Sequence, residues 1–253
     1  MIQLLISGIN GKMGRMICSR ACCADTFKIV GGFDTIADPS CNVFTKPKDI
    51  NITFDAVLDF SRPEALDDII SIASTHNKPC VLATTGYTDK QVQKIQALSK
   101  KVPVFLSGNM SVGIHVMQKL VESAVKNLWG CFDIEVIEKH HNQKVDAPSG
   151  TAKMLENTIA SASNGQAKFL YGREGNHTKR QPNEVTVHAI RGGTIVGEHE
   201  VHFCGNGEVI TISHSALSRT IFADGALKAV EFLITKKAGL YTMTDLVDSS
   251  LTK

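Results

Sequence analysis

The residues best suited to chemistry gather in one stretch, "EKHHNQKVDAPSGTAK", which runs from Glu138 to Lys153. Two adjacent histidines, His140 and His141, are followed three residues later by Lys144. Histidine exchanges protons near neutral pH, and lysine supplies a localised positive charge. This grouping predicts a site that binds an anion and moves a proton.

The end of the same stretch predicts the start of a helix. Asp146 or Ser149 is a suitable N-cap, and the chain continues through Gly150 and Thr151. Backbone N–H groups at a helix N-terminus attract anions because they carry the positive end of the helix dipole. The stretch therefore predicts a substrate that bears a carboxylate. A structural alternative stays open, in which the histidines end a strand as a hydrogen-bonded pair and the lysine is a surface cation.

A glycine pattern at the N-terminus predicts a second site. In "ISGINGKMGRM", Gly8, Gly11 and Gly14 form G-x-x-G-x-x-G directly after an apolar run. Such glycines allow a tight turn, a close approach to a diphosphate and packing of the next helix. Asp34 comes twenty residues after Gly14, where a carboxylate can hold ribose hydroxyls. The pattern predicts a dinucleotide site, and a mere tight turn is the alternative.

The choice between NADH and NADPH stays open. Asp34 favours a free 2′-hydroxyl, because a 2′-phosphate would meet a like charge. Lys12 and Arg15 can offset that charge, or they can belong to a solvated helix face. Thr35 follows Asp34, and use of both cofactors with a tilt towards NADH is the expectation.

The first hundred residues alternate short apolar runs with amphipathic stretches. The runs predict strands at 3–7, 28–34, 55–60, 79–84 and 103–108, and the stretches predict helices at 12–24, 63–76 and 88–100. Continuous apolar character is typical of strands buried on both faces. The fold class predicted is α/β, with an N-terminal Rossmann-type, doubly wound parallel sheet.

The pattern then changes to α+β. Helices are expected at 112–127, 151–162 and 219–236, a strand at 132–141, and a loop at 169–183. Three roughly alternating runs at 184–190, 194–203 and 208–214 predict further strands. "RGG" and "GNG" separate these runs and predict hairpin turns. The second half should therefore hold an antiparallel or mixed sheet, whose edges offer surfaces for pairing between subunits.

Composition narrows the class of protein. The 253 residues are 43% hydrophobic and 21% charged, with a formal net charge of +2, which favours neither nucleic acid nor a membrane surface as partner. Neither a run of 18 apolar residues nor a signal-peptide pattern occurs in the sequence. The seven cysteines show neither a disulfide framework nor a metal-site spacing, which favours free thiols, no metal and a cytoplasmic location.

The stretch around His140 resembles the signature E-x-H-H-x-x-K-x-D-x-P-S-G-T-A of the 4-hydroxy-tetrahydrodipicolinate (dihydrodipicolinate) reductases. "SGINGKMG", "DFSRPEA", "ATTGY", "SGNMSVGIHVM", "GGTIVGEHEVHF" and "SRTIFADGALKA" are similar to other segments of this family, in order along the whole chain. The resemblance implies reduction of a cyclic dicarboxylate by NADH or NADPH on the diaminopimelate route to lysine. It also implies a homotetramer.

The resemblance implies a role for each matching position. His140 would be the acid/base residue and Lys144 the proton donor, and the substrate carboxylates would bind to His141, Lys144, Gly150 and Thr151. The cofactor would bind to Gly8, Asn10, Gly11, Lys12, Met13, Gly14, Asp34, Ser61, Arg62, Thr84, Thr85, Gly86, Asn109, Met110, Ser111, Arg219 and Phe222. The implied domains are 1–110 with 220–253 for the dinucleotide, and 111–219 for substrate and oligomerisation.

Some positions depart from the family pattern, and other functions stay open. Asn142 and Gln143 fill a variable pair and receive no role. Met110 stands where an aromatic residue is common, so its contact can be packing only. The rival functions are another NAD(P)-dependent imine reductase or amino-acid dehydrogenase on the same fold, and a non-catalytic dinucleotide sensor. A sensor would not need the cluster of His140, His141 and Lys144.

Overall fold

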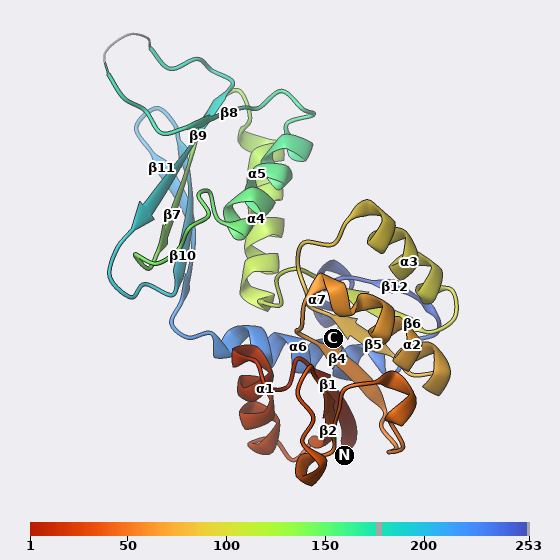
Figure 1. Cartoon of the computed structure of the whole chain (residues 1–253). Helices are drawn as coiled ribbons and strands as arrows, with labels where there is room; N and C mark the ends of the chain where they lie inside the picture. The colour runs from red at the N-terminus through yellow and green to blue at the C-terminus, as the bar shows by residue number, and fades with distance from the viewer. Residues whose placement is uncertain (176–178, 252–253) are drawn as a thin grey trace. The chain divides into compact units, whose positions relative to one another are not determined.

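The computed structural model describes residues 1–175 and 179–251. The chain folds into two units (Figure 1). Unit 1 combines Met1–Val112 with Thr220–Lys253, and unit 2 is Gly113–Arg219. The C-terminal segment therefore belongs to the same unit as the N-terminus.

Unit 1 is built on a parallel sheet with the strand order β12-β6-β5-β4-β1-β2-β3. Its strands are β1 (Ile2–Ser7), β2 (Phe27–Phe33), β3 (Val43–Phe44), β4 (Ala56–Asp59), β5 (Cys80–Leu82), β6 (Pro103–Leu106) and β12 (Gly239–Tyr241). The order reverses direction at β1, as in dinucleotide-binding sheets. All five strands predicted for the first hundred residues form, and the Rossmann-type fold is confirmed.

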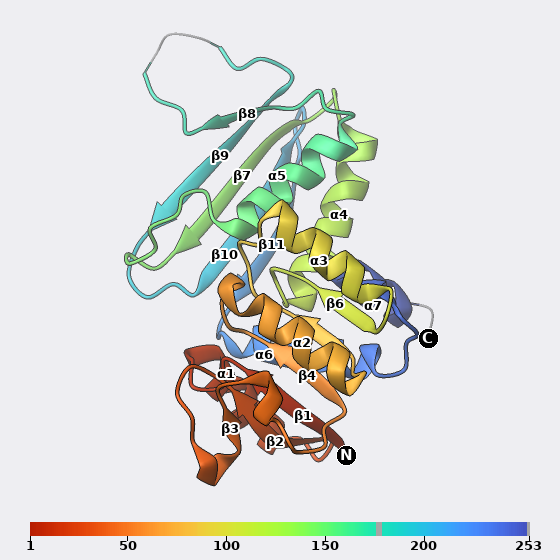
Figure 2. The same cartoon turned by 45° about the vertical axis from the view of Figure 1, so that its right-hand side comes forward.

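Helices cover both faces of this sheet (Figure 2). Side chains alternate along β1, so Leu4 and Ile6 face one way and Leu5 the other. The first face packs against α1 (Lys12–Cys22), α6 (Thr220–Leu233) and α7 (Met243–Leu251). The second packs against α2 (Leu66–His76) and α3 (Asp89–Ser99). Burial on both faces explains why these strands lack a polar alternation.

Unit 2 consists of one β-sheet with a layer of two helices packed on it. Its sheet has the order β11-β10-β7-β9-β8, formed by β7 (Asp133–His140), β8 (Lys168–Tyr171), β9 (Glu184–Arg191), β10 (Gly197–Cys204) and β11 (Val209–Ala216). The long helices α4 (Val112–Leu128) and α5 (Gly150–Ala162) lie on one face (Figure 1). β7 pairs parallel with β9 and antiparallel with β10, so the predicted mixed sheet is confirmed.

Two local predictions for unit 2 are wrong. "RGG" does not close a hairpin, because β7 lies between β9 and β10 and pairs with both. "GNG" does join the antiparallel neighbours β10 and β11, with Gly207 at φ +85°. The start of the predicted loop at 169–183 is strand β8, which pairs parallel with β9; residues 176–178 of that loop lie outside the described residues.

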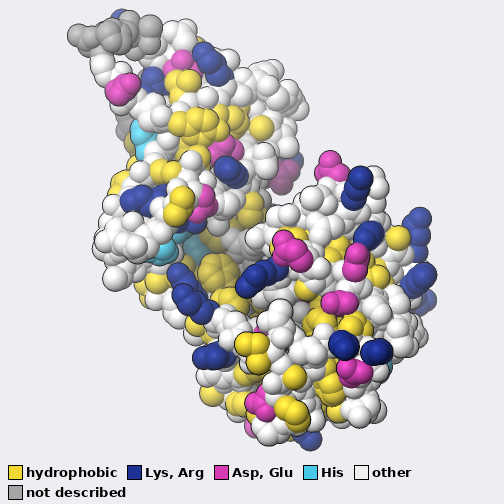
Figure 3. Space-filling model, in the orientation of Figure 1, with side chains coloured by type: hydrophobic (Ala, Val, Ile, Leu, Met, Phe, Trp, Pro, Cys, Tyr) yellow, Lys and Arg dark blue, Asp and Glu magenta, His cyan; other side chains and the backbone are white. Residues whose placement is uncertain are grey.

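The distribution of charge on the surface agrees with the nearly balanced numbers of basic and acidic residues in the sequence. Basic and acidic side chains are interspersed over the face drawn in Figure 3. In the part of the chain that the structure describes, no helix is long and apolar enough to cross a bilayer. All seven cysteines are free, as the sequence predicts.

Candidate active site

His140 ends β7 with its side chain on the helix-covered face of the sheet. Glu138 lies two residues earlier, so its side chain points the same way. Glu138 is fully buried, and its Oε2 lies 2.5 Å from His140 Nδ1. This hydrogen bond directs Nε2 of His140 away from the carboxylate, which leaves Nε2 as the nitrogen available for proton exchange.

Arg191 holds the carboxylate from the neighbouring strand. Its NH1 and NH2 groups donate to Glu138 Oε2 and Oε1 at 2.8 and 2.7 Å. Burial by itself would raise the pKa of Glu138, but hydrogen bonds from His140 and Arg191 outweigh it and lower the pKa from 4.5 to about 2. Glu138 is therefore a carboxylate at neutral pH.

Ser149 is the N-cap of α5. Its Oγ accepts from Ala152 N at 3.2 Å, and its backbone N–H donates to Glu138 Oε1 at 3.1 Å. Of the two caps considered from the sequence, Ser149 is correct and Asp146 is wrong. The predicted carboxylate-binding residues Gly150 and Thr151 are the first two residues of this capped helix.

His199 of β10 completes the cluster. Its Nε2 lies 3.0 Å from Ser149 Oγ, and its ring stands edge-on to that of His140 with centroids 5.2 Å apart. Burial lowers the pKa of His199 to about 4, with further electrostatic contributions from His140, His214 and Lys144. His199 is thus neutral at pH 7. Lys144 is linked to this cluster through Asp146, whose side chain contacts Lys144 and whose backbone O accepts from Arg191 NH2 at 2.7 Å.

Lys144 is held by the carboxylate that was expected to cap the helix. Its Nζ lies 2.8 Å from Asp146 Oδ1, and its backbone N–H donates to His141 O at 3.1 Å. The Lys144 side chain is 20% exposed and the Asp146 side chain 58%. Hydrogen bonding by Lys144 lowers the pKa of Asp146. An incoming carboxylate would compete with Asp146 for this ammonium group.

The glycine loop of unit 1 has the geometry that a diphosphate requires. Gly8 has φ +76°, and a Cβ there would lie 2.7 Å from Phe60 O. A Cβ at Gly14 would lie 2.2 Å from Gly8 O, so α1 can approach β1 this closely only with glycine. Gly11 occupies the N-cap of α1 and carries no side chain over its N–H groups. Lys12 and Met13 follow in the first turn. The loop fits a bound dinucleotide.

Asp34 is fixed where β2 ends. Its Oδ2 accepts from Asn10 N at 2.9 Å, and its Oδ1 accepts from Thr35 N at 2.7 Å. Asn10 Nδ2 also donates to Ile36 O at 3.3 Å. The loop after β1 and the end of β2 are thereby held together, as a site for an adenosine ribose requires.

A buried carboxylate also orders the loops after β4 and β5. Asp59 is 1% exposed and accepts from Ser61 Oγ at 2.5 Å, from Thr84 Oγ1 at 2.7 Å and from Tyr87 OH at 3.4 Å. Ser61 and Thr84 are predicted cofactor residues. Others in these loops are exposed, namely Arg62, Thr85 and Gly86. Neighbouring loops at the carboxyl ends of parallel strands form the usual crevice for a nicotinamide.

The remaining predicted cofactor residues are split between the units. Asn109, Met110 and Ser111 form a buried turn in unit 1, where Asn109 Oδ1 accepts from Ser111 N at 2.9 Å. Met110 packs into the core, in line with a packing role. Phe222 is partly buried against the same core, and Arg219 is the last residue of unit 2.

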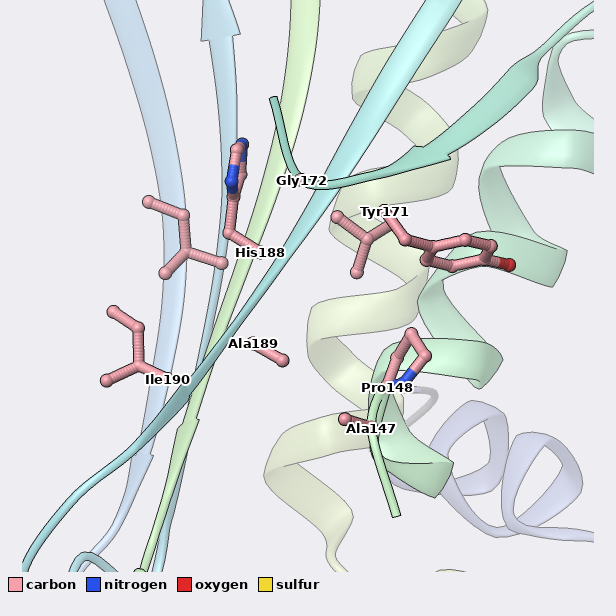
Figure 4. Close-up of a pocket in the computed structure, with 9 residues that line it drawn as sticks. Ala147, Pro148, Tyr171, Gly172, His188, Ala189 and Ile190 are labelled. Atoms are coloured by element: carbon pink, nitrogen blue, oxygen red, sulfur yellow. The ribbon is translucent and has the colours of Figure 1, made fainter. Parts of the chain in front are cut away.

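A groove of about 680 Å³ lies at the edge of the unit 2 sheet, where β8 ends beside β9 (Figure 4). Tyr171, Pro148 and Ala147 lie on one side of β9, and His188 and Ile190 lie on the other. The lining includes none of the predicted site residues. The candidate active site is therefore the His140 cluster rather than this groove.

Four residues of these clusters had no assigned role in the sequence analysis. The sequence offered a signal for two of them. Glu138 lies two residues before His140 on a predicted strand, and Asp59 lies two residues before the predicted cofactor residue Ser61. Arg191 and His199 carry no comparable signal, since only the pairing of β7 with β9 and β10 brings them to His140.

Comparisons with known proteins agree along the chain. Residues 2–110 and 113–247 match the profiles described as "Dihydrodipicolinate reductase, N-terminus" and "Dihydrodipicolinate reductase, C-terminus". The chain is 49% identical to the 4-hydroxy-tetrahydrodipicolinate reductase of Clostridium novyi, over 98% of this chain and 99% of that protein. It is 48% identical to that of Caldanaerobacter subterraneus, over 98% of both.

The fold is also found among solved structures. A dipicolinate-bound dihydrodipicolinate reductase from Paenisporosarcina sp. TG-14 has a TM-score of 0.80 at 24% identity, covering 96% of this chain and 97% of that chain.

Proposed function

The chain belongs to the dihydrodipicolinate reductase family, and on that premise we propose that it reduces 4-hydroxy-tetrahydrodipicolinate to tetrahydrodipicolinate with NADH or NADPH, in the diaminopimelate route to lysine. The observation that carries the proposal is the cluster in unit 2. There, a buried carboxylate orients His140 and contacts the N-cap of α5, and Arg191 joins it to Asp146, the partner of Lys144.

Unit 1 would hold the cofactor. The diphosphate would lie on the first turn of α1, against Gly8, Asn10 and the residues Gly11, Lys12, Met13 and Gly14. Asp34 would bind the adenosine ribose, and the loops ordered by Asp59 would bind the nicotinamide end. Bound NAD(P)H supplies a hydride. The Asp34 carboxylate favours NADH over NADPH, because it repels a 2′-phosphate.

Unit 2 would bind the substrate and supply the proton. A planar dicarboxylate carries two negative charges, which Lys144, His141 and the start of α5 at Gly150 and Thr151 would neutralise. Reduction of a conjugated imine leaves negative charge on nitrogen, and that charge requires a nearby proton. His140 through Nε2 and Lys144 through its ammonium group are the proposed acid/base residues.

Two substitutions test the proposed proton carriers. His140→Ala and Lys144→Ala should each lower kcat/KM by about 100- to 10,000-fold, because that is the usual effect of removing a positioned acid or base. Circular dichroism and thermal unfolding should show a retained fold. Exposed Lys228→Ala is the matched control and should keep wild-type activity. Near-normal turnover in both alanine variants would refute these roles.

One coupled assay tests the reaction itself. Pyruvate and aspartate semialdehyde are mixed with the upstream synthase and reduced cofactor, and the loss of reduced-nicotinamide absorbance is followed after addition of the protein. Rapid oxidation is expected, with a higher kcat/KM for NADH than for NADPH. A flat trace with both cofactors, from folded protein, would overturn the proposed function. A panel of mono-carboxylate imines and amino acids separates it from an amino-acid dehydrogenase.

Three broader proposals accompany this function. Residues 1–110 with 220–253 would form the cofactor domain, and 111–219 the substrate and oligomerisation domain. We propose a homotetramer in the cytoplasm. The face of the unit 2 sheet opposite α4 and α5 supports assembly, because the apolar side chains of Ile190 and Val209 are exposed there and a second copy would bury them. Sedimentation analysis would give four times the 27.4 kDa chain mass if this is correct.

A further inference from the structure

The ion pair between Glu138 and Arg191 joins a fully buried carboxylate to a guanidinium group whose side chain is 19% exposed, and it contacts more of the fold than a simple salt bridge does. Glu138 is 0% exposed, and it lies inside strand β7 rather than at its end. Removing a carboxylate from water is costly unless its oxygens are hydrogen-bonded and its charge is balanced. Stability alone does not explain the pair, because apolar side chains of similar size often replace a buried ion pair without loss of folding stability.

The two carboxylate oxygens of Glu138 contact three different elements. Oε2 lies 2.5 Å from His140 Nδ1 and 2.8 Å from Arg191 NH1. Oε1 lies 2.7 Å from Arg191 NH2 and 3.1 Å from Ser149 N. One side chain thus joins the end of β7, the end of β9 and the N-cap of α5.

Arg191 extends the same network into the segment between β7 and α5. Its NH2 also donates to Asp146 O at 2.7 Å, and its NH1 to Ile190 O at 2.8 Å. Asp146 is in turn the partner of Lys144. The guanidinium group therefore holds the backbone of the loop that carries Lys144, while it balances the charge of Glu138.

The space around Nε2 of His140 is kept clear on one side by a glycine. A Cβ at Gly197 of β10 would lie 3.1 Å from Nε2 and 3.4 Å from Cδ2 of the ring. Glu138 thus fixes the ring from Nδ1, and Gly197 leaves the ring room in that orientation. A carboxylate at Nδ1 selects the tautomer and orients the imidazole, as it does for histidines in catalytic and metal sites.

We propose that Glu138, held by Arg191, is a positioning residue that fixes the tautomer and orientation of His140 and keeps the start of α5 and the Lys144 loop in register with it. The inference rests on the proposed function, because His140, Lys144 and α5 are its proposed reacting and binding groups. The proton carrier and the carboxylate-binding backbone are then oriented by one charge. Other charged or titratable groups near the pair are Asp146 and His199, and Lys144 is the partner of Asp146.

Glu138→Gln is the direct test, because it keeps the shape and removes the charge. We expect kcat to fall about 10- to 100-fold, the usual cost of losing an outer partner of a functional histidine. Nitrogen-15 NMR of the neutral imidazole should show a single Nδ1–H tautomer in the wild type and a tautomer mixture in the variant. Glu156→Gln, which neutralises another buried carboxylate of unit 2, is the matched control. It should change neither kcat nor the tautomer of His140.

A double variant separates positioning from structure. Glu138→Met with Arg191→Met replaces the pair by apolar side chains of similar length and should fold at least as stably as the wild type. The proposal requires that kcat stays about 10- to 100-fold low and that the tautomer mixture persists. Wild-type kcat in a folded double variant, or an unchanged tautomer in Glu138→Gln, would overturn the proposal. Failure of the proposed function would appear separately, as a wild-type protein that shows the single tautomer and no turnover.

Discussion

At the scale of single residues, the ion pair between Lys144 and Asp146 predicts that Asp146 competes with the proposed dicarboxylate substrate. Its Oδ1 lies 2.8 Å from Lys144 Nζ, and the Asp146 side chain is largely exposed. Exposed ion pairs contribute about 0.2–1 kcal/mol, so removing the competitor should tighten dicarboxylate binding by about 1.4- to fivefold. Asp146→Asn should therefore lower the Kd for dipicolinate measured by calorimetry. Weaker binding would mean that Asp146 orients Lys144 rather than competing for it.

A second prediction concerns pH and His199. The folded pKa of about 4 lies below the ordinary 6.5, because burial and neighbouring positive charge disfavour the imidazolium. Between these values the unfolded chain binds more protons, so stability is complete above pH 6.5 and falls as the pH drops towards 4. The loss attributable to this ring is on the order of 3 kcal/mol.

Urea unfolding at pH 7 and at pH 5 measures this loss. The wild type should be clearly less stable at pH 5, and His199→Asn should show a shallower dependence. The low pKa of Glu138 adds to acid unfolding only below about pH 4.5, where its carboxylate begins to be protonated in the unfolded chain. An equally steep pH dependence in the variant would assign the loss to other groups, such as His214.

Residue types and spacing indicated His140, Lys144 and the helix start together, because they lie within one short stretch. The helix start is confirmed, and the roles of His140 and Lys144 stay predictions. Residue types and spacing were not enough for Arg191, which is 53 residues from Glu138 in the chain and reaches it only through strand pairing. The assignment of Asp146 as a cap failed for a related reason. Two good caps stood three residues apart, and the sequence does not say which one pairs with the lysine.

At the scale of elements, α6 depends on a glycine that the sequence did not single out. A Cβ at Gly225 would lie 1.7 Å from Met110 O, which is backbone in a buried turn. Alanine usually stabilises a helix interior by up to about 1 kcal/mol over glycine. Here overpacking against the Asn109–Ser111 turn should outweigh that gain, with a net loss of about 1–3 kcal/mol.

Chemical unfolding of the Gly225→Ala variant shows directly whether the substitution raises or lowers the free energy of unfolding. Gly192→Ala is the control, because nothing in the described residues lies within 4 Å of the added Cβ, and it should change stability by less than about 0.5 kcal/mol. A stabilised Gly225→Ala protein would show that the turn moves aside at little cost. The expected loss would show that α6 fixes a segment predicted to contact the cofactor.

Strand and helix periodicity predicted most elements correctly, and the errors have a common cause. "RGG" and "GNG" look alike, yet only the second joins adjacent strands. Turn residues report local backbone freedom, and they do not report whether a third strand lies between the two. β8 was missed because it is short and half-exposed, so its apolar residues give no clear alternation.

At the scale of the whole molecule, the two units differ in how the chain builds them. Unit 2 is continuous, and its core draws on α4, α5 and the sheet between Gly113 and Arg219. Unit 1 is completed only when the chain returns, since α6 and α7 contribute Leu227, Val230, Leu233 and Met243 to its core. The sequence showed this return only through resemblance to a family, because an amphipathic helix does not reveal which sheet it covers.

The difference predicts opposite behaviour for two fragments. Residues 113–219 should fold alone, with a cooperative thermal transition and the NMR signature of His140. Residues 1–112 should not fold alone, because they lack the apolar side chains that α6 and α7 contribute to the core. Each large side chain lost costs about 1.5–3 kcal/mol, and several are lost together, whereas the total stability of a domain is typically about 5–15 kcal/mol. Adding residues 220–253 as a separate peptide should restore a cooperative transition. A cooperative transition in 1–112 alone would show that β1 to β6 form a sufficient core without the returning helices.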